Sequence, residues 1–392
     1  MTRSTAWGRS PSSSGEQRSR PGPSPRSPVI RCTTAVLLAL LTARAAQAQT
    51  PAPHFYRGLD YGSQAIFNPL TVVLNRGYDV LQDHTGSRDI FAFDYRLNMA
   101  NVLDNVVHPF RAIENRGWKT FLVEEVFPFS FTQDTARWVP NYNLHLIAGG
   151  ATYAALDEWF TAHRVPFPRA FSAAVVMGSA FLNEALENKG VQGPNSDALA
   201  DLYIFDIGGI VLFSFDSVRR FFSETLMIAD WSLQPTLTFP RRELHNQGNY
   251  FAAKYFLPLR PPIFQRLGLF SYFGETTTGG LTLRLDSEYS VSAAVGAIAT
   301  RLVNRSTRAV DNIVRFAPIA GAFLDRNQSL LVSLQVADVD DYFIHLNVYP
   351  HALFSRGPGI GLWAVVDRQG HPALGVVVAA LLGQGIGYYD GL

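Results

Sequence analysis

Apolar and polar residues alternate along most of the last 160 or so residues of this chain, and this alternation constrains the fold more than any other feature. From Trp231 to Phe239 every odd position is apolar and every even position is Ser, Gln or Thr. Because successive side chains of a β-strand point to opposite faces, such a segment has one apolar and one polar face. The alternation recurs in the segments Leu281–Leu285, Tyr289–Ala297, Leu330–Val336 and Tyr342–Val348.

About ten candidate strands follow Asp230, at roughly 231–239, 249–258, 266–273, 278–286, 289–301, 313–323, 329–337, 342–349, 360–367 and 373–381. Lengths of about nine to eleven residues match tilted strands that cross a membrane, whereas strands elsewhere average about five to six. We therefore predict an α+β fold in which a helical subdomain precedes an antiparallel membrane β-barrel of about 10–12 strands, over residues 230–392. The alternative is a periplasmic β-sandwich or lipid-carrying barrel, whose Leu and Val residues would be buried.

Residues 1–48 have the features of a secretory signal with a disordered leader. Thr33–Leu41 is a short apolar core, and Ala46–Ala48 offers the small-x-small site at which we expect cleavage, after Ala48. The single cysteine, Cys32, is removed with this segment, which excludes disulfides and thiolate metal sites in the mature chain. Seven Arg and one Glu are lost as well, so the net charge falls from +1 to about −5 and no basic surface suggests nucleic acid as a partner.

The remaining residues divide into a mixed N-terminal region, 49–140, with a strand expected at Asp89–Leu97, and a helical subdomain, 141–225. Three apolar helices are expected in this subdomain, over Tyr142–Thr161, Pro168–Asn188 and Ala198–Phe222. Each contains a pair of small residues that permits close helix packing, namely Gly149-Gly150, Gly178-Ser179 and Gly208-Gly209. Each also contains carboxylates, which argue against lipid-exposed spans. The alternative is three inner-membrane helices followed by a periplasmic β domain.

The candidate catalytic residues are His145, Glu184 and Asp201, one on each expected helix. If the helices pack side by side, these groups share an interior in which burial and like charge perturb their pKa values. They could then bind a divalent metal or act as a general base in lipid ester hydrolysis. The simpler alternative is structural: Glu184 lies near a helix end and His145 hydrogen-bonds a carbonyl. His108, Asp157, Glu158, Glu187 and Asp197 complete the polar cluster.

Other catalytic motifs are missing from the sequence, which contains no Gly-x-Ser-x-Gly elbow, no phosphate-binding loop and no His-Glu-x-x-His segment. The serine nearest to a histidine in sequence is Ser355, beside His351.

About 110 residues in the middle of the chain resemble a group of uncharacterised bacterial envelope proteins. The resemblance is carried by His108-Pro109, by Glu184, by Ser196-Asp197 with Asp201, and by Gly208-Gly209, followed by barrel strands. It implies an envelope location and a helical unit ahead of a β-barrel, and it implies no activity.

These observations predict a bacterial outer-membrane protein of structural, ligand-binding or transport type, without a cofactor. Its expected partners are outer-membrane lipid or lipopolysaccharide, which the basic turn Arg241-Arg242 would contact, and a small apolar ligand. The alternative location is the periplasm. The alternative function is a membrane-associated lipid hydrolase that uses the His/carboxylate cluster on the helices.

Overall fold

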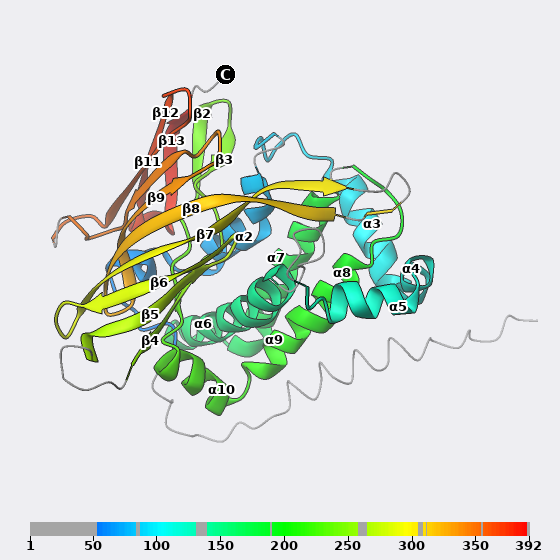
Figure 1. Cartoon of the computed structure of the whole chain (residues 1–392), viewed down its shortest axis with the longest axis horizontal. Coiled ribbons are helices and arrows are strands. Elements are labelled where there is room, and N and C mark those ends of the chain that lie inside the picture. The colour runs from blue at the N-terminus through cyan, green and yellow to red at the C-terminus, as the bar shows by residue number, and fades with distance from the viewer. Residues whose placement is uncertain are drawn as a thin grey trace, which may run out of the picture. The chain divides into compact units, whose positions relative to one another are not determined.

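The computed structural model describes residues 53–83, 87–130, 139–188, 190–257, 265–304, 309–310, 312–353 and 356–389, all within the unit Thr50–Leu392. The predicted signal segment, its cleavage site and Cys32 lie outside the described residues. Helices form one side of this unit and a curved sheet forms the other (Figure 1). The chain is therefore α+β, with helices that precede most of the strands.

The helical elements, with 3₁₀ and π segments marked η, are η1 (Gly62–Ile66), α2 (Pro69–Gly77), η2 (Asp79–Asp83), α3 (Tyr95–Val107), α4 (Pro109–Arg116), α5 (Trp118–Thr120), η3 (Phe121–Val126), η4 (Val139–Ala148), α6 (Gly149–Ala162), α7 (Pro168–Glu187), α8 (Asp197–Ala200), η5 (Asp201–Asp206), α9 (Ile207–Leu212), α10 (Asp216–Arg220), η6 (Phe221–Thr225) and η8 (Ala379–Leu381).

The strand predicted at Asp89–Leu97 is wrong, because helix α3 begins at Tyr95. Asp94 caps this helix, since its carboxylate accepts a hydrogen bond from the Leu97 N–H at 3.0 Å. A capping side chain of this kind satisfies one of the free N–H groups of the first turn. The helix therefore starts inside the segment that was predicted as a strand.

The three helices predicted after residue 141 are present with two differences. The first begins as the π-helix η4 and continues as α6, and the second is α7 as expected. The third is broken after Leu212, and its two halves are bent by 86°. At this break the Arg219 Nε donates a hydrogen bond to the Phe213 carbonyl oxygen, at 2.6 Å. Among the described residues no single helix has the length and apolar character of a membrane span, and only this bent pair has them in combination.

In the described part of the chain, thirteen strands form one sheet: β1 (Ala229–Asp230), β2 (Thr236–Pro240), β3 (Glu243–His245), β4 (Phe251–Phe256), β5 (Leu267–Phe273), β6 (Thr276–Arg284), β7 (Tyr289–Asn304), β8 (Asn312–Arg326), β9 (Ser329–Ala337), β10 (Ile344–Val348), β11 (Ile360–Val366), β12 (Pro372–Val378) and β13 (Gln384–Tyr389). Strands β4 to β13 follow one another in sequence order, and each pairs antiparallel with the next. Among these thirteen strands, the one parallel pair is β13 with β2.

The predicted barrel of about 10–12 strands is corrected to this 13-stranded sheet, which is not closed into a barrel. Its order runs from β1 at one edge to β3 at the other. The ladder is interrupted in two linkers, residues 231–235 between β1 and β2 and residues 246–250 between β3 and β4. In the first linker Pro235 has no N–H to donate, and in the second Asn246 has a φ of +52°. Two backbone hydrogen bonds nevertheless join the linking segments, from Trp231 N to Tyr250 O at 2.8 Å and from Leu233 N to Gly248 O at 3.0 Å.

The outer face of the sheet is apolar and its inner face is largely polar. One row of directly paired residues crosses strands β9 to β13, and it contains Leu334, Leu346, Ala364, Leu374 and Tyr388. Leu334 is 44% exposed and Leu374 is 51% exposed. The neighbouring row contains Ser333, Asn347 and Trp363, all of which are buried. The predicted alternation is thus confirmed in these strands, with the apolar side chains outward.

The segment Trp231–Phe239 departs from this arrangement. Trp231, Leu233 and Gln234 are all buried. The Leu233 carbonyl accepts a hydrogen bond from Asn75 of α2, and the Gln234 side chain donates one to Asn347 of β10. Trp231 packs against Phe270 and Phe323 in an aromatic cluster on the inner side of the sheet. The interior therefore contains an aromatic part in addition to its polar part.

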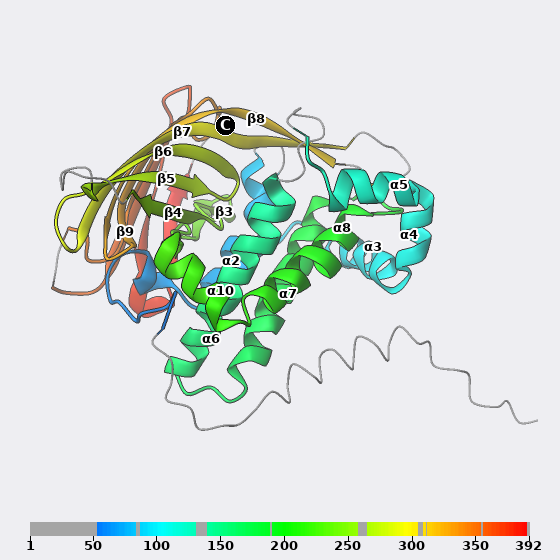
Figure 2. The same ribbon diagram turned by 60° about the horizontal axis from the view of Figure 1, so that its bottom comes forward.

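Residues 61–83 fill the space on the inner side of the sheet. They donate hydrogen bonds to several strands and loops, from Gly62 to Pro350, Gln64 to Ser329, Asn68 to Leu382 and Asn75 to Leu233, and Gln82 accepts one from the Tyr250 hydroxyl. The long β7–β8 pair extends toward the helical side, where Val310 N donates to Pro194 O at 3.0 Å (Figure 2). The helices and the sheet are therefore joined in two places, through residues 61–83 and through the end of the β7–β8 pair.

Candidate functional site

The three residues predicted as catalytic meet in the helical unit. His145 lies on η4, Glu184 on α7 and Asp201 at the start of η5. One ligand atom from each lies within 4.8 Å of the others, and all three residues are buried, with Glu184 only 1% exposed. The prediction of a shared site required the three helices to pack side by side, and they do so.

Small residues allow the helix backbones to approach here. A Cβ atom added to Gly209 would lie 2.5 Å from the carbonyl oxygen of Leu146, and one added to Gly150 would overlap the ring of Phe213. Both glycines are therefore required by close packing, as predicted. Gly178 has no such role, because no described atom lies within 4 Å of the position of an added Cβ.

Two of the three residues of the site lie on π-helical segments. His145 is within η4 and Asp201 begins η5. A π-helical turn contains an extra residue relative to an α-helix and redirects the side chains that follow, and such turns occur frequently at functional sites. The local backbone therefore contributes to the convergence of these side chains.

A chain of contacts orients the imidazole of His145. Its Nδ1 lies 3.3 Å from Asp206 Oδ2, and its Nε2 lies 3.6 Å from Asp201 Oδ2. The other oxygen of Asp206 accepts a hydrogen bond from the guanidinium of Arg76. Asp206 thus lies between a buried arginine and the histidine, and it fixes the ring so that Nε2 faces the two acids.

Burial raises the pKa of the Glu184 carboxyl well above its ordinary value, and nearby carboxylates, first Glu187 and then Asp201, raise it further. Burial and Asp197 act in the same way on the pKa of Asp201. Glu184 Oε1 and Asp201 Oδ1 also have no hydrogen-bond partner among the described residues. A buried carboxylate without a partner is costly, so these oxygens require a proton or a cation.

Three other residues of the predicted polar cluster, His108, Asp157 and Glu158, have structural contacts. His108 is exposed and lies 3.1 Å from Asp104, and Asp157 forms a buried ion pair of 2.7 Å with Arg219. The Glu158 carboxylate accepts hydrogen bonds from three consecutive backbone N–H groups, those of residues 54–56. His108 and Asp157 thus have partners of their own, distinct from the three residues of the site.

A second group of catalytic residue types was not predicted from the sequence. The Ser223 hydroxyl oxygen lies 3.2 Å from His54 Nδ1, and His54 Nε2 lies 3.1 Å from Asp216 Oδ1. This hydrogen bond to His54 holds the pKa of Asp216 below its ordinary value. A pocket of about 360 Å³ is lined by His54 and Ser223 together with Arg57 and Gln328. No sequence signal could have found this group, because His54 lies 162 residues from Asp216.

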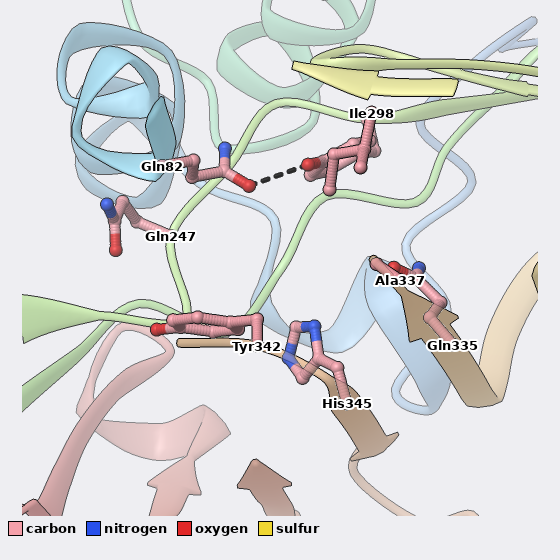
Figure 3. A pocket seen from close by; sticks show the side chains of 8 residues that line it. Gln82, Gln247, Ile298, Gln335, Ala337, Tyr342 and His345 are labelled. Carbon is pink, nitrogen blue, oxygen red and sulfur yellow. Dashed lines mark hydrogen bonds between the residues drawn. The ribbon is translucent and has the colours of Figure 1, made fainter. Parts of the chain in front are cut away.

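The inner side of the sheet contains a small cavity of about 20 Å³, which is lined by both polar and apolar side chains (Figure 3). Gln82 and Gln247 line it from one side and Gln335 and His345 from the strands. Among the described residues, Gln82 Nε2 and Gln335 Nε2 have no hydrogen-bond partner. A cavity of this volume with several polar side chains in its wall has room for about one water molecule, so the interior at this point is closely packed rather than open.

The chain was also compared with known proteins. No protein-family model matches it, and searches of the curated proteins and of the solved structures find no significant match either.

Proposed function

We propose that this chain is a bacterial outer-membrane protein whose sheet is embedded in the lipid, with a structural or ligand-binding role. The observation that carries the proposal is the apolar outer face of the sheet. Members of this face are exposed Leu, Val, Ile and Tyr residues: Leu269, Leu281, Leu283, Val291, Val295, Leu334, Val336, Ile344, Leu346, Ile360, Leu362, Leu374, Val376, Ile386 and Tyr388. An apolar surface that continues over so many strands is unfavourable in water and favourable in a bilayer.

The inner face supports the same proposal. Thr278, Thr282, Ser292, Ser333 and Asn347 are buried there, on the side that would face away from lipid. A sheet with polar residues inside and apolar residues outside reverses the partition expected in water. Residues 61–83 fill the interior, which favours a structural or ligand-binding role over that of an open pore.

A sheet in lipid must also satisfy the backbone groups at its edges, because an unpaired N–H or C=O there costs several kcal/mol. The bonds from Trp231 to Tyr250 and from Leu233 to Gly248 link the two edges of the ladder. We propose that in the membrane these bonds, together with those of the Asn75 side chain, satisfy the backbone groups of the two linkers.

The helical unit has an exposed apolar surface as well. It is formed by residues of α3, α4, α5 and η3, namely Leu103, Val107, Phe110, Trp118, Leu122 and Val123. Aromatic side chains are favourable at the boundary between lipid and water. The exposed turn Arg241-Arg242, between β2 and β3, is suited to lipid or lipopolysaccharide phosphates.

Single cysteines test the membrane proposal directly, because the predicted mature chain has none. Two variants, Val295→Cys and Leu374→Cys, place the cysteine on the outer face. The matched control, Gln369→Cys, places it in an exposed turn. In phosphatidylethanolamine–phosphatidylglycerol vesicles, a fluorophore at residues 295 and 374 should be quenched by nitroxide on the acyl chains. The fluorophore at residue 369 should instead be quenched by aqueous iodide.

Equal iodide quenching at all three positions would contradict the membrane proposal. Recovery of the mature protein in the periplasmic fraction without detergent would contradict it independently.

A second candidate function is hydrolysis of an envelope ester at Ser223, and it is favoured by the two hydrogen bonds of His54. The Ser223 oxygen would add to the ester carbonyl carbon while its proton passes to His54 Nδ1. Cleavage of the C–O bond would release the alcohol, which takes that proton. Water would then hydrolyse the acyl-serine to a carboxylic acid and restore Ser223.

A fluorophosphonate probe tests this candidate. Mass spectrometry should locate one adduct on Ser223 in the wild type and in the control Ser217→Ala, an exposed serine on α10, and none in Ser223→Ala. His54→Gln should slow labelling. The absence of an adduct on Ser223 in the folded wild type would reject the hydrolase. The catalytic role predicted for His145, Glu184 and Asp201 stays a prediction.

A further inference from the structure

The side chains of His145, Glu184 and Asp201 are arranged as ligands rather than as paired groups. His145 Nε2 points toward Asp201 Oδ2 at 3.6 Å, which is longer than a hydrogen bond, and the three ligand atoms lie within 4.8 Å of one another. We propose that these three residues bind one divalent transition-metal ion, of the zinc class, which holds η4, α7 and η5 together.

The contact between His145 and Asp206 is an independent indication of this role. A histidine that ligates a metal through one ring nitrogen almost always donates the other N–H to a carboxylate or carbonyl. Here Nδ1 lies 3.3 Å from Asp206 Oδ2, and Arg76 holds the other oxygen of Asp206. Nε2 is thereby left with its lone pair directed at Glu184 and Asp201.

The charge balance of the site points the same way. Glu184 and Asp201 are 1% and 6% exposed, and one oxygen of each has no partner among the described residues. Arg76 is paired with Asp206 rather than with these two acids. A divalent cation would supply the positive charge and the bonds that the two oxygens lack.

The distances fit a small ion after little movement. A tetrahedral zinc ion, with bonds of about 2.0–2.2 Å, separates its ligand atoms by about 3.4 Å. The 3.6 Å between His145 Nε2 and Asp201 Oδ2 is close to this value, and the limit of 4.8 Å requires one side chain to approach further. One nitrogen and two carboxylate donors favour Zn²⁺ over Mg²⁺, which prefers oxygen ligands alone.

Zinc binding by the mature protein, purified in detergent without a histidine tag, tests the proposal. After EDTA treatment and desalting, the protein should take up about one equivalent of Zn²⁺ by mass spectrometry, and its melting temperature should rise. Mg²⁺ at the same concentration should have no such effect. Failure of the folded wild type to bind stoichiometric zinc would overturn the proposal.

Variants locate the site. Glu184→Gln and Asp201→Asn should each weaken zinc binding by about tenfold or more, and Asp206→Asn should weaken it by about tenfold through the imidazole. Asp104→Asn, an exposed acid of the same helical unit, is the matched control and should bind zinc as the wild type does. Zinc affinity that is unchanged in Glu184→Gln and Asp201→Asn would overturn the assignment.

Stability in the absence of metal separates loss of a ligand from loss of the fold. Because the amide of Glu184→Gln is neutral without a bound proton or cation, this variant should melt at or above the temperature of the metal-free wild type. A folded variant that no longer responds to zinc supports the site. A folded variant with the full zinc response rejects it.

Discussion

The side chain of Asn75 on α2 accepts a hydrogen bond from the Gly248 backbone N–H at 3.0 Å. Its amide nitrogen donates to the Leu233 carbonyl, also at 3.0 Å. Leu233 and Gly248 belong to the two linkers that lie between the edges of the strand ladder, and they also bond to each other. One buried side chain of the N-terminal segment thus joins both linkers where regular strand pairing is interrupted.

Asn75→Ala should destabilise the protein by roughly 1–3 kcal/mol, because it leaves buried backbone groups of both linkers without partners. Guanidinium unfolding in detergent, followed by tryptophan fluorescence, measures this loss. Asn115→Ala is the control, since the Asn115 side chain is exposed and donates its hydrogen bond to Arg111 of its own helix. Equal unfolding midpoints for Asn75→Ala and Asn115→Ala would contradict the structural role of Asn75.

Two glycines of similar sequence context should respond in opposite ways to replacement by alanine. Gly209→Ala places a methyl group 2.5 Å from the Leu146 carbonyl oxygen, so we expect a loss of about 1–3 kcal/mol in the free energy of unfolding. Gly178→Ala meets no described atom within 4 Å and should be neutral or stabilising by up to about 1 kcal/mol. Thermal melting of both variants checks the prediction. A neutral Gly209→Ala would show that the helices are less closely packed.

Asp79 should make stability depend on pH. Burial raises the pKa of this carboxyl from its ordinary 3.8 to about 8, with Glu187 acting in the same direction and Arg76 against it. Between these pH values the folded state holds a proton that the unfolded state has lost. Stability from this group is therefore present at low pH and lost as pH rises toward 8, by at most about 1.4 kcal/mol per pH unit.

Unfolding midpoints of the wild type and of Asp79→Asn between pH 5 and pH 8 measure this dependence. The amide cannot titrate, so the variant should lose part of the decline with pH, whereas the exposed control Asp104→Asn should keep it. The same slope in Asp79→Asn and in the wild type would show that Asp79 titrates normally.

Glu158 should hold the start of the described chain in place. Its carboxylate accepts the N–H groups of His54, Phe55 and Tyr56 at 2.7–2.9 Å. Glu158→Gln has one acceptor oxygen instead of two, so we expect a loss of about 1–3 kcal/mol and faster hydrogen exchange at residues 53–57. Glu114→Gln, an exposed acid on α4, serves as the control. Unchanged exchange in Glu158→Gln would show that other contacts hold this segment.

Local periodicity was sufficient to predict much of the sheet and the helices. Strand β9 has the bounds expected from the sequence, and α7 differs from its expected range by one residue. Strand β13 was not predicted, because Gly385 and Gly387 weaken the alternation. These glycines are needed because an added Cβ on Gly387 would lie 2.6 Å from the Leu374 carbonyl oxygen, a contact that no local pattern reveals.

The residues of the candidate metal site could be identified from the sequence as acids and a histidine on apolar helices, but their partners could not. Asp206 and Arg76 are 130 residues apart, and no local pattern indicates that α2 and η5 come close enough for their hydrogen bond. The contacts of His54 with Asp216 and Ser223 span 162 and 169 residues. The residue type alone shows that a side chain is costly to bury. Which residue becomes its partner depends on packing between distant elements.

The sequence by itself determined which residues share a strand face, since a period of two assigns every side chain to one side or the other. It also determined that carboxylates and a histidine lie on apolar helices. Only the tertiary structure decided which strand face is exposed, that residues 61–83 fill the interior, and that the strand ladder stays open between β1 and β3. These features depend on contacts between segments far apart in the chain, and local periodicity contains no information about such contacts.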